Sequence, residues 1–408
     1  MMMAKRGTTT VVPRLRFPEF RKAAEWARKP LRVLLDYERP EKYIVTNAVY
    51  QDSGTPVLTA NKSFVLGYTD ELDGIYFATP VIIFDDFTTD RKYVDFPFKV
   101  KSSAIKILKP KNDDSLKLIF ELMGGIRFEP KEHKRYYISE YQDLEIAIPR
   151  RPEQQRIVDC LTSLDEVIAA QGRKVEALKT HKRGLMQQLF PREGETRPRL
   201  RFPEFRNAPD WALGKASDIV DVLQGYGFPE RLQGSRDGEF PFYKVSDISA
   251  CVDAGSILLD EANNQIDADV LEELRAKLMP VGSTVFAKIG EAIRSNKRAI
   301  TSRPCLVDNN AAGVKAIAGL AHDRFVYYLW CQVPLIEYAG GVVPAVNKSA
   351  MEQIPVCYPK PEEQKRIADC LASLDTLIAT ESRQLAALKT HKQGLMQQLF
   401  PQVEEDDA

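Results

Sequence analysis

The sequence has little that suits a membrane or a secreted protein. No window comes near the roughly 18 uninterrupted apolar residues that a transmembrane helix needs. No apolar core follows the basic residues among the first ten, so a secretory signal is not expected. The six cysteines are scattered and show no Cys-x-x-Cys spacing. Because a reducing cytosol keeps such cysteines as free thiols, we expect a cytoplasmic protein that does not enter a membrane.

Net charge and catalytic motifs are also missing. The 57 Lys and Arg balance 57 Asp and Glu, which excludes a uniformly basic surface and leaves nucleic-acid binding to local patches. There is no Pro-Pro dipeptide, which adenine methyltransferases need in an (Asn/Asp)-Pro-Pro-aromatic loop, and no Walker A loop for ATP. The four histidines lack metal-ligand spacing. We therefore expect no catalytic residue, no metal and no cofactor in this chain.

The chain is an internal duplication. Residues 13–21, Pro-Arg-Leu-Arg-Phe-Pro-Glu-Phe-Arg, recur unchanged as residues 198–206. Residues 149–191 align without gaps with residues 359–401, with 28 identities in 43 positions. Two unlike stretches, about 30–148 and 213–358, lie between the repeated pieces. We interpret this order as one scaffold, present twice, that carries two divergent domains.

The longer repeat has the pattern of a coiled-coil helix. Its apolar residues fall on the a and d positions of a heptad, and Pro191 or Pro401 ends each copy. Roughly 37 residues at about 1.5 Å each give a helix near 55 Å, which is long for a helix of a globular core. The predicted seam consists of Ile157, Leu161, Leu164, Ile168, Val175, Leu178, Leu185 and Leu189, and of Ile367, Leu371, Leu374, Ile378, Leu385, Leu388, Leu395 and Leu399. Gln171 and Lys182, and their equivalents Glu381 and Lys392, interrupt the seam.

The unlike stretches predict mixed α/β domains. We expect strands at residues 74–79, 81–84, 282–288 and 298–301, and helices at 115–123, 269–277 and 323–330. The predicted fold class is α+β, with two mixed α/β domains joined by two long helices in an antiparallel, pseudo-two-fold coiled coil. The predicted boundaries are 1–148 for the first domain with its short motif, 149–192 for the central helix, 193–358 for the second domain, and 359–408 for the C-terminal helix and acidic tail.

Clusters of cations, amides and hydroxyls within the two domains are candidates for DNA contact, because such groups bind phosphates and read base edges. In the first domain we select Lys62, Arg91, Lys92, Lys99 and Lys101, with Thr59, Asn61 and Ser63 nearby. In the second domain we select Tyr226, Arg231, Gln233, Arg236, Lys244, Lys288, Arg294, Asn296, Lys297, Arg298 and Lys348.

One acidic cluster raises an alternative. Asp86, Asp90 and Lys92 could form a magnesium-dependent nuclease site, which needs carboxylates and a lysine near one metal-bound water. The first two lie only four residues apart, whereas that type of site draws them from separate strands. A charged loop at a strand end is the better interpretation. Another alternative is a coiled-coil interaction scaffold that does not read DNA.

Taken together, the motifs resemble the specificity subunits of type I restriction-modification systems over nearly the whole chain. Both long repeats open on Glu-Gln-x-x-Ile and continue into Leu-x-x-Leu-Asp, and both end on Lys-x-Gly-Leu-Met-Gln-Gln-Leu-Phe. In the second domain, residues 286–290 (Phe-Ala-Lys-Ile-Gly) and 308–310 (Asp-Asn-Asn) are similar to motifs of target-recognition domains. The first domain has Phe-Asp-Asp-Phe at residues 84–87 and no Asp-Asn-Asn, so it resembles another subclass.

The resemblance implies a DNA-binding subunit that is not itself an enzyme. Each domain would read half of a split, asymmetric DNA target, and the helices would set the unread spacer between the halves. Two methyltransferase subunits would bind the scaffold and methylate adenine with S-adenosylmethionine, while separate motor-nuclease restriction subunits would cut unmodified double-stranded DNA.

Overall fold

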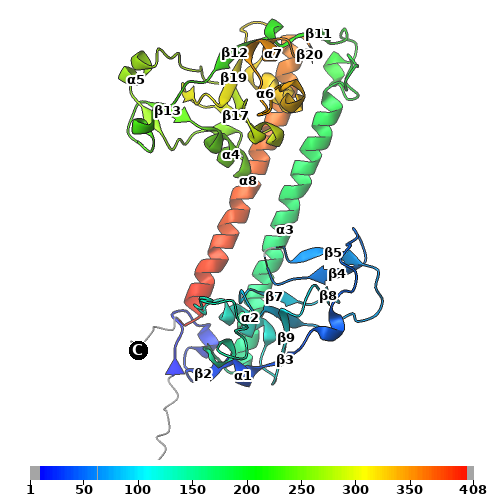
Figure 1. Cartoon of the computed structure of the whole chain (residues 1–408), viewed down its shortest axis with the longest axis vertical. Helices are drawn as coiled ribbons and strands as arrows, with labels where there is room; N and C mark the ends of the chain where they lie inside the picture. The colour runs from blue at the N-terminus through cyan, green and yellow to red at the C-terminus, as the bar shows by residue number, and fades with distance from the viewer. Residues whose placement is uncertain (1–9, 62, 402–408) are drawn as a thin grey trace, which may run out of the picture. The chain divides into compact units, whose positions relative to one another are not determined.

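The computed structural model describes residues 10–61 and 63–401 (Figure 1). They form two compact units. The first unit contains the chain up to Ile168 and again from Ala387, and the second contains Ala169–Ala386. Both boundaries fall inside the long helices α3 (Arg151–Leu189) and α8 (Pro361–Leu399). Each unit therefore holds one mixed domain, the start of one long helix and the end of the other.

The first unit is built from three small sheets and short helices. Their strand orders are β3-β9-β6-β7, β5-β4-β8 and β1-β2-β10. The strands are β1 (Thr10–Val11), β2 (Trp26–Pro30), β3 (Leu35–Glu38), β4 (Thr55–Leu58), β5 (Val65–Thr69), β6 (Val81–Asp85), β7 (Arg91–Val94), β8 (Lys99–Val100), β9 (Ile105–Pro110) and β10 (Glu145–Ile148). The helices are η1 (Pro18–Phe20), α1 (Leu31–Leu34), η2 (Glu41–Tyr43), α2 (Leu116–Met123) and η3 (Tyr141–Asp143).

The central strand β6 separates two apolar cores. Successive side chains of a strand point to opposite faces, so a strand buried on both faces reads as a continuous apolar run. Ile82 and Phe84 join a core with Trp26, whereas Val81 and Ile83 join another core with Phe98. The strand predicted at residues 81–84 is thereby confirmed.

The second unit has a five-stranded sheet of order β12-β19-β16-β17-β14, with two smaller sheets β15-β13-β18 and β11-β20. Its strands are β11 (Ala212–Lys215), β12 (Val220–Gln224), β13 (Phe240–Tyr243), β14 (Leu258–Leu259), β15 (Gln265–Ile266), β16 (Thr284–Ala287), β17 (Arg298–Thr301), β18 (Leu306–Val307), β19 (Ala311–Ala316) and β20 (Pro355–Tyr358). Its shorter helices are η4 (Pro203–Phe205), η5 (Ala216–Asp218), η6 (Glu230–Leu232), α4 (Val245–Asp253), α5 (Ala268–Glu273), η7 (Glu291–Ser295), α6 (Asp323–Gln332), η8 (Leu335–Tyr338) and α7 (Lys348–Glu352).

Helix α6 packs on the five-stranded sheet and supplies the largest part of the core. Phe325, Tyr328 and Trp330 are fully buried on it, beside Phe286 of β16. The helix predicted at residues 323–330 is thus confirmed, and it continues for two further residues.

Some predicted elements differ in extent. The helix expected at residues 269–277 is the shorter α5, because Arg275 adopts a left-handed backbone conformation with φ of 47°. The prediction of a strand at residues 74–79 is wrong. Only Tyr76 pairs there, through one bridge to Phe98, and Gly74 turns the chain with φ of 67°.

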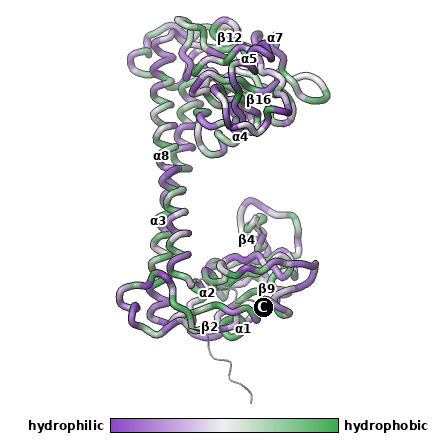
Figure 2. Tube along the Cα trace, turned by 90° about the vertical axis from the view of Figure 1, so that its left-hand side faces the viewer, coloured by the Kyte–Doolittle hydropathy of each residue, from purple (hydrophilic) through white to green (hydrophobic). Residues whose placement is uncertain are grey.

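The long helices keep their apolar seam inward. None of the predicted seam residues is exposed, and Ile157, Leu161, Ile367 and Leu371 are within 1% of full burial. The first two pack into the core of the first domain and the last two into the core of the second. Hydrophobic residues are interspersed with hydrophilic ones in the long-helix region of Figure 2. The seam residues thus lie inward, as the heptad pattern predicts, and the ends of the seam also belong to the domain cores.

Polar residues join α3 to α8 at the interruptions of the seam. In the first unit Lys392 Nζ lies 2.6 Å from Asp165 Oδ1, and in the second unit Lys182 pairs with Asp375. Glu381 is 7% exposed and accepts a hydrogen bond from Gln171 Nε2 at 2.7 Å. Since residues early in one helix meet residues late in the other, the two helices are antiparallel.

The structure also tests the expectations about membrane-spanning helices and about the cysteines. None of the helices in residues 10–61 and 63–401 has the length and apolar character needed to cross a membrane. All six cysteines are free thiols.

Candidate nucleic-acid interface

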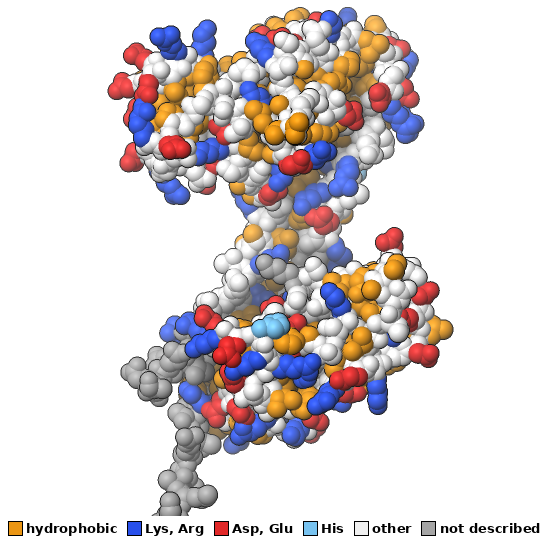
Figure 3. All heavy atoms as spheres, in the orientation of Figure 1, with side chains coloured by type: hydrophobic (Ala, Val, Ile, Leu, Met, Phe, Trp, Pro, Cys, Tyr) orange, Lys and Arg blue, Asp and Glu red, His pale blue; other side chains and the backbone are white. Residues whose placement is uncertain are grey.

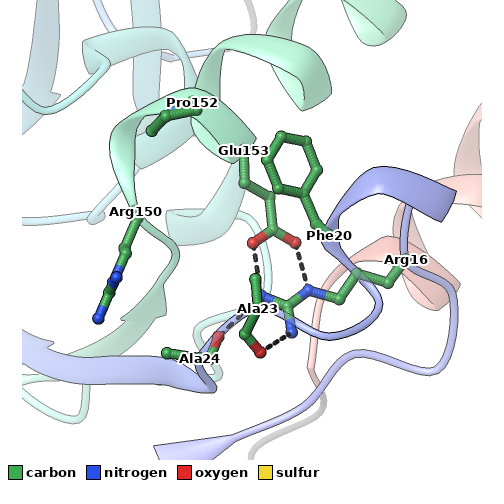
Figure 4. A pocket seen from close by; sticks show the side chains of 7 residues that line it. All are labelled: Arg16, Phe20, Ala23, Ala24, Arg150, Pro152 and Glu153. Atoms are coloured by element: carbon green, nitrogen blue, oxygen red, sulfur yellow. Dashed lines mark hydrogen bonds and ion pairs between the residues drawn. The ribbon is translucent and has the colours of Figure 1, made fainter.

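Each domain is fixed to the start of a long helix by the same buried ion pair. Arg16 of the first short motif donates to both carboxylate oxygens of Glu153 at 2.6 Å, and the indole of Trp26 donates to the same carboxylate at 3.3 Å. Two further guanidinium N–H groups donate to the carbonyls of Ala23 and Ala24, as Figure 4 shows. The glutamate raises the pKa of Arg16. The short motif therefore clamps its domain to α3.

The second copy repeats this clamp. Arg201 donates to both oxygens of Glu363 at 2.7 Å, and Trp211 donates to that carboxylate at 3.4 Å. Both partners are nearly fully buried, with side-chain exposures of 6% and 3%. The duplicated Arg and Trp were visible in the sequence, and so was the Glu that opens each long repeat. Their pairing was not.

In the second domain, predicted residues from distant segments meet in one cluster. Lys288 follows β16 and donates to Gln224 Oε1, at the end of β12, at 2.6 Å. The Lys288 N–H donates to the carbonyl of Asn310 at 2.8 Å, in the turn that follows Asp308. Burial lowers the pKa of Lys288 and raises the pKa of Asp308. Thus the Phe-Ala-Lys-Ile-Gly and Asp-Asn-Asn motifs form a single site with Gln224.

The loop after β12 extends this cluster. Tyr226 N donates to the carbonyl of Val307 at 2.9 Å, and a Cβ at Gly225 would lie 1.8 Å from the Asp308 carbonyl oxygen, so only glycine fits there. Lys244 reaches Gln233 Oε1 at 2.8 Å and lies 5.4 Å from the Phe228 ring centre. We name the set Gln224, Tyr226, Gln233, Lys244, Lys288 and Asp308 the second-domain cluster.

Several other second-domain candidates bind within the protein instead. Arg298 is 2% exposed, donates to Asn296 Oδ1 at 2.6 Å, and lies over the Phe286 ring at 4.9 Å. Burial lowers its pKa to about 10. Asn296 also donates to the Cys331 carbonyl at 3.2 Å. Both predictions are corrected: these two side chains bind each other and the carbonyls of Cys331 and Val333, which holds the 291–298 turn against the end of α6.

The other cations predicted to contact DNA in the second domain differ in their exposure and in their ion-pair partners. Lys297 pairs with Asp253 at 2.6 Å, Arg294 pairs with Glu291 at 2.8 Å, and Arg231 pairs with Glu273. Lys348 is about half exposed and lies 3.6 Å from Glu352. Arg236 is exposed, and within residues 10–61 and 63–401 it has no ion-pair partner. Exposed pairs of this kind are weak, so these side chains can exchange a carboxylate for a phosphate.

In the first domain, two predicted contacts are structural. Lys99 is 3% exposed and pairs with Glu71 at 2.8 Å, which lowers the pKa of Glu71 to about 2. Arg91 donates to the Met123 carbonyl at 2.5 Å and to Tyr141 Oη at 3.4 Å. Both predictions are corrected, since tertiary contacts consume these cations. Lys62 lies outside the described residues, whereas Lys101 is exposed and Lys92 half-buried.

The structure brings together a different surface in the first domain. Asp85 caps the turn between β6 and β7 by accepting from the N–H groups of Phe87 and Thr88, and Thr88 contacts Asn61 at 3.3 Å. The ring of Phe87 stacks on His133 at 4.7 Å, and Arg135 lies 5.9 Å from the same ring centre.

His133 and Arg135 are exposed, and the basic run of residues 131–135 was a sequence signal that we did not use. We name Asn61, Phe87, Thr88, His133 and Arg135 the first-domain cluster. A partly exposed aromatic ring beside an arginine and an amide can contact bases and phosphates.

The acidic cluster has a structural role. Asp86 is 1% exposed, pairs with Lys106 at 3.2 Å, and accepts from the Tyr137 N–H at 2.8 Å. Asp90 is exposed at the end of the same turn. Because its oxygens are taken up by a lysine and a backbone amide, Asp86 supports the turn that presents Phe87, and the geometry does not favour the nuclease alternative.

Cationic and acidic side chains are intermixed over the visible face of each unit in Figure 3. This distribution agrees with the balanced composition and leaves local clusters as the candidate contact sites.

The amino-acid sequence is similar to a known protein family and to characterised proteins. A family model described as the type I restriction modification DNA specificity domain matches residues 209–390. The specificity subunit of the Escherichia coli type I restriction enzyme EcoR124I/EcoR124II is 30% identical over 387 residues, covering 86% of this chain and 87% of that protein. The putative MjaX specificity subunit of Methanocaldococcus jannaschii is 25% identical over 270 residues, or 64% and 60% of the two chains.

A solved structure agrees at the level of the fold. The S subunit of a type I restriction-modification system from M. genitalium superposes with a TM-score of 0.64 at 13% identity, covering 96% of this chain and all of that one.

Proposed function

We propose that this chain, which belongs to the specificity subunits of type I restriction-modification systems, reads a split and asymmetric DNA target, with one half of the target assigned to each domain. The observation that carries the proposal is the duplicated clamp. Two domains of unlike sequence are attached through the same Arg-Glu-Trp contact to the start of equivalent helices. A scaffold that holds two different readers in equivalent ways suits a target with two different halves.

The second-domain cluster supplies the chemistry for its half-site. Gln233 carries an exposed amide that can pair with adenine, and Lys244 orients it. Lys288 holds the partly buried Gln224 beside it in the cluster. The unpaired Arg236 and the weakly paired Lys348 and Arg294 can bind phosphates and set the register of the domain on the duplex.

The first-domain cluster supplies a different chemistry. It offers a stacked aromatic pair, the Arg135 guanidinium and the Asn61 carboxamide on adjoining loops. Lys101 lies beside the end of β4, shortly before Asn61, because its backbone N–H donates to the Leu58 carbonyl at 3.0 Å. Because the two clusters share neither residues nor geometry, the two half-sites should differ in sequence.

The chain acts with DNA and with other subunits of the restriction-modification system. We infer that it is non-catalytic and binds no cofactor itself. Two methyltransferase subunits would bind the duplicated scaffold and supply S-adenosylmethionine chemistry at adenine, and motor-nuclease restriction subunits would join that complex. The duplication supports a stoichiometry of two, since each clamp and helix start recurs.

The test is to express the chain with its methyltransferase in a host that lacks adenine methylation, and then to sequence the methylome. We expect one bipartite, asymmetric motif that disappears when either protein is omitted. Exchanging residues 30–148 for the corresponding domain of another specificity subunit should change one half of the motif and leave the other. A swap that altered both halves, or neither, would contradict the modular assignment.

A salt series separates DNA reading from a purely structural scaffold. Binding of the assembled complex to a target duplex should weaken steeply with salt, since phosphate contacts release counterions. A flat response would favour the scaffold alternative.

A further inference from the structure

The second domain carries an apolar turn that none of the contacts above uses. Residues 340–346 read Gly-Gly-Val-Val-Pro-Ala-Val and connect η8 to α7. The side chain of Val342 is fully exposed, with a relative exposure of 104%, and that of Val343 is 62% exposed. Single exposed valines are ordinary on protein surfaces. Here two stand together, at the tip of a turn held by backbone hydrogen bonds.

The backbone fixes this tip. Gly340 and Ala345 exchange two hydrogen bonds of 3.0 and 3.1 Å, which closes the turn. Gly341 has a φ of 92°, a conformation that strongly favours glycine, and a Cβ there would lie 3.2 Å from the Val343 carbonyl oxygen. The valines are therefore presented on a preformed turn.

The same turn is attached to the second-domain cluster. The Gly290 N–H donates to the Pro344 carbonyl at 2.8 Å, and the Val346 N–H donates to the Lys288 carbonyl at 2.9 Å. The valine tip is thus paired with the segment that carries Lys288, whose Nζ orients Gln224. Lys348, about half exposed, begins the helix directly after it. An apolar tip adjoins amides and cations suited to a DNA groove.

The chemistry of the tip limits what it can recognise. Its side chains contain neither a hydrogen-bond donor nor an acceptor, so it cannot read the polar pattern of base edges. The thymine C5 methyl is the apolar group that bases present in the major groove. We propose that Val342 and Val343 contact a thymine methyl in the half-site read by the second domain. This inference rests on the proposed function, and its occupant is duplex DNA rather than a protein partner.

The test is a double-mutant cycle between protein and DNA. The full chain, with its methyltransferase, is titrated with a fluorescent duplex that carries the methylome-defined target. In other duplexes each thymine of the second half-site is replaced in turn by deoxyuridine, which lacks the methyl. The protein variants are V342S/V343S and the control V281S, which changes a valine that is 49% exposed elsewhere in the unit.

We expect one deoxyuridine position to weaken binding by the parent about fourfold, as burial of one methyl group implies. The V342S/V343S variant should bind the unmodified target about as weakly as the parent binds that substituted duplex, and the substitution should then have no further effect. The slope of affinity against salt should stay unchanged, because no charge is removed. V281S should behave like the parent.

A second variant guards against misfolding or general weakening. V342K adds a cation to the tip; it should lower affinity if the tip is packed against a base, and raise it if the tip merely faces the phosphate backbone. Thymine effects that persist in V342S/V343S would overturn the proposal, as would V342K binding more tightly than the parent. Loss of the methyltransferase from the purified V342S/V343S complex would assign the tip to a protein partner instead. If the parent complex binds no target, the proposed function itself fails.

Discussion

Removing the carboxylate of Glu363 should destabilise the second unit far more than an ordinary surface substitution. The Arg201 guanidinium that it binds is nearly buried and makes two hydrogen bonds to this one carboxylate. In E363A the guanidinium would keep only the carbonyls of Ala208 and Pro209, at 2.8 and 2.9 Å. Breaking a buried pair in this way costs about 3–5 kcal/mol, because a charge stays buried without its partner.

Removing both charges should cost less. In R201M/E363L apolar groups of similar size replace the pair, and such exchanges are often neutral or stabilising. The single R201M would leave the carboxylate buried and should resemble E363A. A clear recovery in the double variant would show that the main function of the pair is to specify the attachment of the domain.

Unfolding of the full chain in guanidinium chloride, monitored by tryptophan fluorescence, measures this loss of stability. Trp211 donates to Glu363 and Trp26 donates to Glu153, so each unit has a reporter at its clamp. E363A should shift the transition of the second unit, and E153A should shift that of the first. E204A is the matched control, since Glu204 pairs with Arg366 at the surface and both are about half exposed. A loss below about 1 kcal/mol in E363A, or one no larger than that of E204A, would refute the reasoning.

The remaining predictions address the two clusters and the helices. K288M should weaken target binding about tenfold and relax the preference at one base of the second half-site, because Gln224 loses its orienting lysine; anisotropy titration with base-substituted duplexes measures this, with K365M as the control. R135A should weaken binding and lower the salt slope by about one while leaving the thermal midpoint unchanged, whereas K99M should lower the midpoint because it strands Glu71. Hydrogen bonds from Lys174 and then Gln171 lower the pKa of Glu381. Its contribution to stability is therefore present above its ordinary pKa of 4.5 and lost as the pH falls through the lower folded value, so E381Q should flatten the acid limb of a stability–pH curve. Inserting one heptad after Gln171 and one after Glu381 should lengthen each helix by about 10.5 Å. The unread spacer should then grow by up to about three base pairs, with the same bases read at each end, and methylome sequencing tests this.

The helices and their seam could be predicted because their information is local. A 3.5-residue period repeats along one segment, so Ile157 or Leu371 can be assigned to the seam without knowledge of the fold. Strand β6 was predictable for the same reason, since its run of apolar residues is continuous. The short motif was conspicuous only because it occurs twice.

The division of cations into surface and structural groups could not be predicted. Lys99 lies only two residues from Lys101 and Arg298 only four residues from Arg294, yet Lys99 and Arg298 are buried whereas the other two are exposed. What separates them is a tertiary partner: Glu71 for Lys99, and the Val333 carbonyl, 35 residues away, for Arg298. Spacing in sequence does not reveal such partners. The stacking of Phe87 on His133 was missed for the same reason, since these residues belong to separate loops.

Duplication also explains how the helices find their direction. Asp165 and Lys182 of α3 are equivalent to Asp375 and Lys392 of α8, and the two members of each pair are equally far apart. In an antiparallel arrangement the aspartate of each helix meets the lysine of the other, as observed at both places. A parallel arrangement in the same register would set aspartate against aspartate and lysine against lysine. These contacts are partly exposed, so each adds little to stability. Because a parallel arrangement would bring like charges together, the duplicated charges favour antiparallel pairing over parallel pairing.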